Sequence, residues 1–192
     1  MLSRRAISLA IAGLAIAAAV VLAVVLRRSG PTPAASTPPA AAPAAPERRI
    51  NATLYYVSED GMSLVGVQRE VPFGESVLEQ AERIVQAQLA PAPPPLVSAI
   101  PGGTALRAIY VTDRGDAFVD LSMDARTKHS GGALDELFTV YTIVDALTVN
   151  LPAITRVQIL IEGQEVDTLA GHVDLRNPLQ KNLQWVRTDS PS

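Results

Sequence analysis

The stretch from residue 131 to residue 161 joins a helical pattern to a strand pattern across a short turn. Apolar side chains recur there at spacings of three and four, which predicts an amphipathic helix of about four to five turns. They are Leu134, Leu137, Phe138, Tyr141, Val144, Leu147 and Leu151. Pro152 ends this helix, because proline lacks an amide N–H and disfavours helical backbone in the residue before it. Residues 156–161 alternate β-branched apolar side chains, as a buried strand does, so we expect the helix to pack against the sheet that contains them.

Local patterns elsewhere in the chain predict two β-hairpins and another helix. Turn residues separate each pair of apolar, β-branched runs, and a cluster of prolines stops the first helix. The predicted strands cover residues 50–57, 62–71, 106–111, 117–121, 156–161 and a short 164–168, and the first helix covers residues 75–89. The element order is therefore ββαββαβ(β). We predict an α+β fold in which two helices cover one small mixed sheet of about five to six strands.

The N-terminal part predicts a membrane anchor. Residues 6–26 are 21 residues without a charge, and at about 1.5 Å per residue they span a hydrocarbon core of roughly 30 Å. A cleaved signal peptide is the alternative, but its apolar region is usually about 7 to 15 residues long. Arginine pairs flank both ends of the segment, so the short tail, residues 1–5, decides the orientation. We expect a single-pass anchor with that tail in the cytoplasm and the folded domain outside.

The rest of the chain divides into a tether, one domain and a tail. Residues 27–48 are rich in proline and alanine, a composition typical of an extended spacer. The domain covers residues 49–180, and we expect Trp185, in the tail 181–192, to close over its core. The net charge is −3 with scattered lysines and arginines, so no basic patch indicates a nucleic-acid partner. The chain has no cysteine, which excludes disulfides, a thiolate nucleophile and a lipid-modified cysteine.

No residue pattern predicts catalysis, a cofactor or a metal site. His129 and His172 are the only histidines and lack zinc-binding spacing, and Gly102-Gly103 predicts a turn, because no P-loop lysine follows it. A triad of Ser122, His129 and Asp135 lacks a nucleophile elbow, so we expect the Ser122 hydroxyl to meet backbone groups at a strand end. The spacing of the acidic residues does not fit a calcium loop, and we expect them on a solvated strand face. They are Asp113, Asp116, Asp120 and Asp124.

Four residues are candidates for an interaction or for fixing a loop. His172 follows Gly171 in a predicted loop, where a histidine either binds a ligand or pins the loop by hydrogen bonds, and we favour pinning. Asp145 lies beside the apolar stripe and is either solvated or paired with a buried donor. Tyr55 and Tyr56, together with the single tryptophan, are the only support for a ligand cleft with clustered aromatic rings.

The chain from about residue 50 to residue 179 resembles the GerMN domain family, the sporulation and spore germination domain. The resemblance rests on seven blocks whose order and spacing hold over about two thirds of the chain. The blocks are Leu54-Tyr55-Tyr56, Arg69-Glu70-Val71, Ile100-Pro101-Gly102-Gly103-Thr104, residues 117–122, residues 137–150 running into Pro152, residues 157–163, and Thr168-Leu169-Ala170-Gly171-His172. The resemblance implies a compact extracytoplasmic domain, similar to the ring-building modules of secretion and sporulation complexes, and no catalysis.

Three classes of function follow from these observations. We expect a non-catalytic, membrane-anchored scaffold that binds an envelope protein or its own copies through an exposed sheet edge or helix face. The alternative is a module that recognises cell-wall glycan or a small ligand, which requires an aromatic cleft. An enzyme of peptidoglycan or another envelope substrate requires a pocket that joins carboxylates or histidines, and the sequence does not predict one.

Overall fold

The computed structural model describes residues 48–187. The predicted cytoplasmic tail and anchor, nearly all of the predicted linker and the last five residues of the chain lie outside this range. Among the helices of residues 48–187, none combines the length and the apolar character needed to cross a bilayer.

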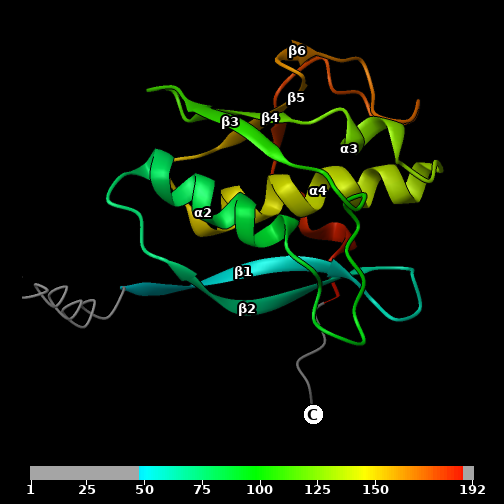
Figure 1. Cartoon of the computed structure of the whole chain (residues 1–192), viewed down its shortest axis with the longest axis horizontal. Coiled ribbons are helices and arrows are strands. Elements are labelled where there is room, and N and C mark those ends of the chain that lie inside the picture. Colours follow the sequence, from blue (N-terminus) through cyan, green and yellow to red (C-terminus); the bar gives the residue numbers. More distant parts are fainter. Residues whose placement is uncertain (1–47, 188–192) are drawn as a thin grey trace, which may run out of the picture. The chain divides into compact units, whose positions relative to one another are not determined.

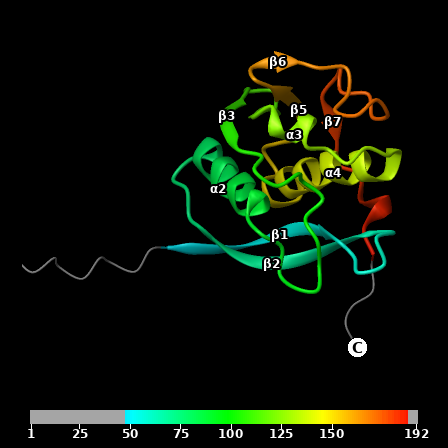
Figure 2. The same ribbon diagram turned by 45° about the vertical axis from the view of Figure 1, so that its right-hand side comes forward.

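Two helices lie between two separate β-sheets (Figure 1). The first sheet is a hairpin of β1 (Arg49–Val57) and β2 (Leu64–Pro72), and α2 (Val77–Leu89) and α4 (Ala133–Asn150) form the middle layer. The second sheet contains β3 (Leu106–Val111), β4 (Asp116–Leu121), β5 (Arg156–Ile161), β6 (Gln164–Glu165) and β7 (Leu179–Gln180). A short helix, α3 (Asp124–Thr127), precedes α4, and a 3₁₀ turn, η1 (Leu183–Trp185), follows β7. The turned view in Figure 2 keeps the same layering.

The mixed α+β content is confirmed, but the prediction of one sheet covered by two helices is wrong. The two hairpins do not join into a common sheet, because α4 packs against β1 on one side and β5 on the other. The predicted stripe holds for Phe138, Val144 and Leu147, whereas other buried residues lie around the rest of the helix. A helix that is apolar around most of its circumference needs cover on more than one side. The second hairpin therefore belongs to a different layer from the first.

The second sheet has an apolar inner face and a polar outer face. β3 pairs with β4 antiparallel, and β4 pairs with β5 in parallel through the crossover that contains α4. The residues that face the helices are at most 2 % exposed; they are Ala117, Val119, Leu121, Val157, Ile159 and Ile161. The alternate positions of β4 and β5 are mostly polar, except for Phe118 and Leu160, and Gln158 is buried where its amide donates to the Leu175 carbonyl. β6 and β7 pair with the far edge of β5.

Two side-chain amides close the outer edge of β1. The backbone N–H of Tyr55 donates to Gln88 Oε1 at 2.9 Å, and Gln88 Nε2 donates to the Tyr55 carbonyl at 2.7 Å. Asn150 makes the same pair of bonds to the Thr53 backbone, both at 2.8 Å. Val57 exchanges backbone hydrogen bonds with Val97 in the following loop. Each amide therefore takes the place of a residue in a neighbouring strand, and the last turns of α2 and α4 replace a third strand.

Removing one of these amides tests the edge closure. Gln88→Leu leaves a buried N–H and a buried carbonyl on Tyr55 unpaired, so we expect the free energy of unfolding to fall by about 2 to 3 kcal/mol. Gln86→Leu on the exposed face of the same helix is the matched control and should change stability by less than about 0.5 kcal/mol. Urea unfolding of both variants measures the difference, and equal effects would contradict the proposed closure.

Candidate functional site

The structure does not bring Ser122, His129 and Asp135 together as a catalytic triad. The Ser122 hydroxyl accepts the Ala105 N–H at 3.0 Å at the end of β4, as predicted for a strand end. Ser130, not Ser122, bonds to Asp135, with its Oγ 3.1 Å from Asp135 Oδ2. His129 instead accepts the Gly131 N–H at Nδ1, which places its ring proton on Nε2, 3.1 Å from Thr139 Oγ1. These side chains fix the entry to α4 and do not form a nucleophile with a base.

The acidic residues of the second sheet form ion pairs, so the prediction of a solvated strand face is wrong for two of them. Asp116 binds Arg156 through two contacts, 2.7 and 3.1 Å long. Asp120 is 6 % exposed and accepts from Arg107 at 3.1 Å and from the Gly163 N–H at 2.7 Å. Cross-strand pairing explains this, because neighbouring positions of paired strands bring opposite charges together on the outer face. Within the part of the chain that the structure describes, no group of three potential metal ligands occurs.

Two other local predictions have a clear outcome in the structure. The segment from Pro101 to Thr104 is a turn, closed by two bonds from Thr104 to the Pro101 carbonyl. Tyr55 and Tyr56 are 3 % and 0 % exposed and belong to the core. Burial and then the charge of Asp145 raise the pKa of Tyr55 to about 12. The aromatic cleft of the glycan interpretation therefore loses the support of both tyrosines.

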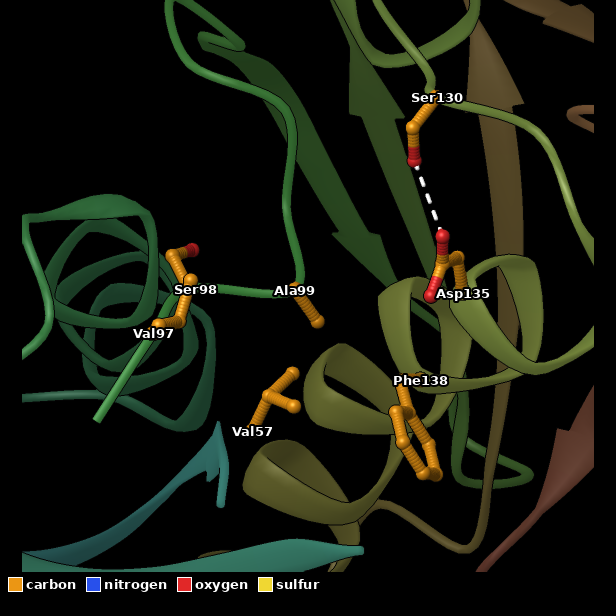
Figure 3. A pocket seen from close by; sticks show the side chains of 7 residues that line it. All are labelled: Val57, Val97, Ser98, Ala99, Ser130, Asp135 and Phe138. Atoms are coloured by element: carbon orange, nitrogen blue, oxygen red, sulfur yellow. Dashed lines mark hydrogen bonds between the residues drawn. The ribbon is translucent and has the colours of Figure 1, made fainter. Parts of the chain in front are cut away.

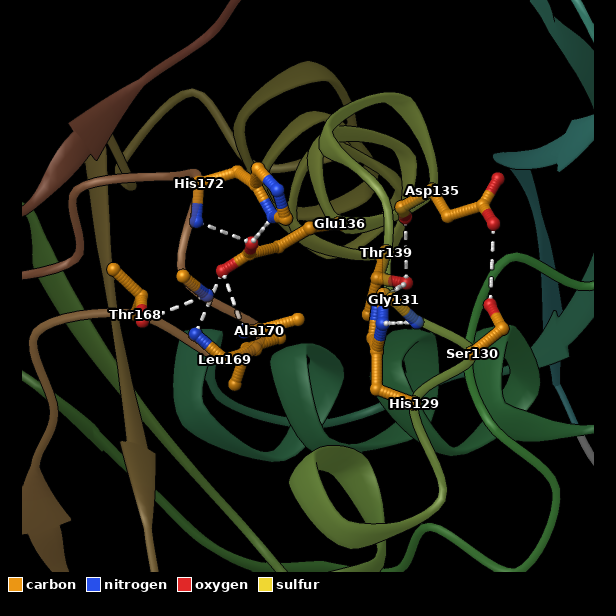
Figure 4. A network of polar contacts seen from close by, with 11 residues as sticks. His129, Ser130, Gly131, Asp135, Glu136, Thr139, Thr168, Leu169, Ala170 and His172 are labelled. Atoms are coloured by element: carbon orange, nitrogen blue, oxygen red, sulfur yellow. Dashed lines mark hydrogen bonds and ion pairs between the residues drawn. The ribbon is translucent and has the colours of Figure 1, made fainter.

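Glu136 holds the loop that contains His172 (Figure 4). Its side chain is fully buried in the first turn of α4. Oε1 accepts the backbone N–H groups of Leu169 at 2.7 Å and Ala170 at 2.9 Å, and Oε2 accepts the His172 N–H at 2.7 Å. His172 Nδ1 also lies 3.1 Å from Oε2, and its ring is half exposed. The loop is thus tethered mainly through its backbone, with the imidazole as one of several contacts.

The backbone donors determine the charge state of Glu136. Burial alone would raise the pKa of its carboxyl, but N–H groups from the loop outweigh burial and hold the pKa below its usual value. A buried carboxylate with several N–H donors is stable as an anion without a cation. The outer surface of the same loop lines a cavity of about 200 Å³; its lining residues are Asp167, Thr168, His172, Asp174 and Arg176.

Asp145 is buried in the middle of α4 and paired with a backbone donor. The residue is fully buried. Its Oδ1 accepts the Asn182 N–H at 2.9 Å, and its Oδ2 has no hydrogen-bond partner among the described residues. Burial raises the pKa of Asp145 to about 6, against the weaker opposing effects of the Asn182 N–H and Lys181. This contact attaches the segment after β7 to the helix. Further along, the Arg187 N–H donates to the Leu64 carbonyl at 2.8 Å.

A second cavity, of about 230 Å³, opens beside the first turn of α4 (Figure 3). Val57, Val97, Ala99 and Phe138 supply apolar surface, and Ser98, Ser130 and Asp135 supply polar groups. Val97 is 58 % exposed and forms a lip, whereas Phe138 is 1 % exposed. The Ser130 hydroxyl occupies one oxygen of Asp135, and the other oxygen is turned towards the space that Ala99 and Phe138 border.

The outer edge of β2 is occupied at Leu64, which bridges to Val186 and accepts the Arg187 N–H, but among the described residues it is open from Gly66 to Glu70. Thr53 and Tyr55 turn their N–H and carbonyl groups away from β2, so Gln68 and Gly66, which lie opposite them, turn theirs away from β1. Glu70, two residues further on, follows the same alternation. In the described part of the chain these backbone groups have no hydrogen-bond partner. The strand β3 differs, because a register irregularity between Leu106 and Ala108 interrupts its pairing with β4.

Glu136, Gln88 and Asn150 were not predicted from the sequence. Each is a polar residue in a helix that otherwise looks amphipathic, and such residues normally lie on the solvated side. The signal that could have found Glu136 is the one that identified Asp145, a position beside apolar residues in a helix with few charges. Their partners lie 33 to 37 positions away for these two carboxylates and 97 away for Asn150, beyond the reach of any local pattern.

Comparison with known proteins places the chain in a family. A family model described as "Germane: Sporulation and spore germination" matches residues 53–167, which is more than half of the chain. The chain belongs to this family, and the resemblance seen in the sequence is confirmed. A comparison with curated proteins found no match.

Solved structures share the fold. A candidate lipoprotein from Clostridium perfringens is 25 % identical with a TM-score of 0.51, covering 69 % of this chain and 88 % of that one. The tandem GerMN domains of the sporulation protein GerM from Bacillus subtilis are 19 % identical with a TM-score of 0.55, covering 69 % of this chain and 46 % of that one. The first GerMN domain of GerM is 18 % identical with a TM-score of 0.51, covering 69 % and 96 %.

Replacing Glu136 tests the tether of the His172 loop. Glu136→Gln replaces one carboxylate oxygen with an NH₂ group, which cannot accept a backbone N–H, and it removes the negative charge from the remaining acceptor. We therefore expect the free energy of unfolding to fall by about 2 to 4 kcal/mol. His172→Ala keeps the backbone donor and should cost about 1 kcal/mol or less. Denaturant unfolding gives both values, and hydrogen exchange should show faster exchange at Leu169 and Ala170 in the Gln variant. A larger effect of His172→Ala would contradict the backbone tether.

Replacing Asp145 tests its buried carboxyl through pH. Folding raises its pKa from 3.8 to about 6, so the folded state binds the proton more tightly than the unfolded state does. The stability that the protonated carboxyl contributes is therefore lost as the pH rises from about 4 to 6. Asp145→Asn removes this dependence. We expect the variant to match the wild type near pH 4 and to exceed it by about 1 to 3 kcal/mol at pH 7.5. Urea unfolding at both pH values measures this, with Asp113→Asn as the exposed control; a pH-independent difference would contradict it.

Proposed function

We propose that this protein is a non-catalytic envelope scaffold, held at the cell membrane by residues 6–26, whose outward domain binds another envelope protein or a second copy of itself. Its membership of the sporulation and spore germination family supports a role in that setting. The C. perfringens relative is described as a candidate lipoprotein, and a membrane-attached relative supports membrane attachment here. The uncharged N-terminal segment and the extended spacer after it supply the means of attachment.

The observation that carries the proposal is the contrast between the two edges of the first sheet. An open strand edge pairs readily with another extended chain, and proteins usually block such edges. Here β1 is blocked at Thr53, Tyr55 and Val57 by three separate partners. Within residues 48–187, β2 has a partner on its outer edge at Leu64 and is open from Gly66 to Glu70. A strand added along β2 would form main-chain hydrogen bonds, the mode by which many recognition domains bind extended segments.

The polar side chains of the domain support binding rather than turnover. Glu136 is saturated by backbone donors, and Asp116 and Asp120 are engaged by arginines. Catalytic carboxylates and imidazoles need free access to substrate and to each other. These three carboxylates are committed to holding loops and strands in place.

A proline on the open edge tests the docking mode. Gln68→Pro removes an N–H that points away from β1, so it should leave the hairpin intact but block an added strand. The control is Gln68→Thr, which also removes the Gln68 side-chain bond to Thr53 but keeps the backbone donor. The assay is chemical crosslinking and co-purification of the full chain from membranes. We expect the amount of the crosslinked species, whether with a partner or a homo-oligomer, to fall at least tenfold in Gln68→Pro and to be retained in Gln68→Thr.

Two results would contradict the proposal. One is a crosslinked species that is equally abundant in both variants, which would exclude the β2 edge. The other is turnover of an envelope polymer by the purified chain, abolished by changing a single polar side chain.

A further inference from the structure

We propose that the cavity beside the first turn of α4 is a binding pocket for a lysine side chain of a protein partner. This inference rests on the proposed function only in that the lysine comes from a bound protein. The pocket is distinct from the β2 edge, because its residues come from the end of β1, the loop after α2 and the start of α4. It therefore adds a side-chain contact to the main-chain contact proposed above.

The dimensions of the cavity fit one long side chain. Its volume of about 230 Å³ corresponds to seven or eight water molecules at about 30 Å³ each, enough for an unbranched stem of four carbons and an ammonium group. Val57, Val97 and Ala99 offer an apolar wall for the stem, since long basic side chains bury their methylene groups along such surfaces. Phe138 also lines the cavity, on the same side as Asp135 (Figure 3), and adds apolar surface.

The charge of the cavity selects a cation. Asp135 is the only charged residue among the seven that line it, and no described residue forms an ion pair with Asp135. The Ser130 hydroxyl donates to Asp135 Oδ2, so a guanidinium bound to both oxygens would share Oδ2 with it, whereas Oδ1 accepts no hydrogen bond from the described residues. A guanidinium binds best to both oxygens of a carboxylate, whereas an ammonium needs one. The arrangement therefore favours lysine over arginine.

Hydrogen bonds hold the cavity open in advance. Thr139 Oγ1 donates to the Ala99 carbonyl at 2.6 Å and so ties the loop wall to α4. His129 contacts the same hydroxyl through Nε2 and accepts the Gly131 N–H through Nδ1, which fixes the segment that carries Ser130. Ser98 Oγ accepts the Ile100 N–H at 3.2 Å within the loop. A pocket whose walls are already ordered loses less conformational freedom on binding.

Saturation-transfer NMR of the full chain in detergent micelles tests the pocket with a defined probe. The probe is the peptide acetyl-Ala-Ala-Lys-Ala-Ala-amide, and the same peptide with norleucine in place of lysine is the matched control. We expect signal transfer to the lysine methylene protons with a Kd of about 1 mM, as one anchored side chain would give. Norleucine should bind at least about fivefold more weakly, because it lacks the ammonium group that Asp135 pairs with.

Variants of the chain separate the pocket from the β2 edge. Asp135→Asn should weaken lysine binding at least about fivefold while leaving the weak binding of norleucine unchanged, and Ala99→Trp should abolish both by filling the cavity. Thermal unfolding of each variant shows that it is folded; if Ala99→Trp does not fold, Asp135→Asn and the norleucine peptide still decide. Gln68→Pro on β2 should leave peptide binding unchanged, so a failed docking edge and a failed pocket give different results.

Three outcomes would overturn the inference. Equal affinity for the lysine and norleucine peptides would show that the cavity does not distinguish a charged side chain from an uncharged one. Lysine binding unaffected by Asp135→Asn would place the site elsewhere. A peptidoglycan stem peptide with a free side-chain amine that competes at least tenfold better than the protein-like probe would make the cell wall, not a protein, the source of the cation.

Discussion

The structure depends on α4, four of whose polar side chains each bind the backbone of a different segment. Glu136 binds the loop at Leu169 to His172, Thr139 binds the Ala99 carbonyl, Asp145 binds the Asn182 N–H, and Asn150 binds Thr53 in β1. The apolar residues between them fill the space between the two sheets. One helix thus supplies both the common core and the specific attachments of four segments that are far apart in the sequence.

Buried polar groups cost free energy unless each finds a partner, so these attachments decide geometry as well as stability. An apolar contact tolerates small shifts of a loop or strand, whereas a side-chain amide paired with an N–H and a carbonyl fits at only one position. Asn150 shows this most clearly: it bonds both Thr53 backbone groups and also donates to the Ala146 carbonyl of its own helix at 2.7 Å. The register between α4 and β1 is therefore fixed by hydrogen bonds rather than by packing alone.

Local patterns predicted the longer strands and helices nearly at their observed limits, since hairpin turns and helix stops depend on adjacent residues. The short elements were missed: the strand predicted at residues 164–168 is only Gln164–Glu165, and α3 and β7 were not predicted. Residues 156–161 were predicted as a strand and form β5. The layering was missed, because a stripe of apolar residues does not tell whether the opposite side of a helix is solvated or covered by a second sheet. His172 and Asp145 were recognised as unusual, but Glu136 and Asn182, which explain them, could not be identified without knowing which loops return to α4.

The order in which the chain leaves the ribosome gives the closure of β1 a further meaning. The hairpin is made first, whereas Gln88 and Asn150, its closing side chains, follow 33 and 97 residues after their partners. A newly made hairpin therefore has two bare edges until most of the domain has been synthesised, and bare edges are where chains aggregate. Exposure to other chains is longest for this N-terminal hairpin, so its protection before folding falls to whatever machinery receives the nascent protein.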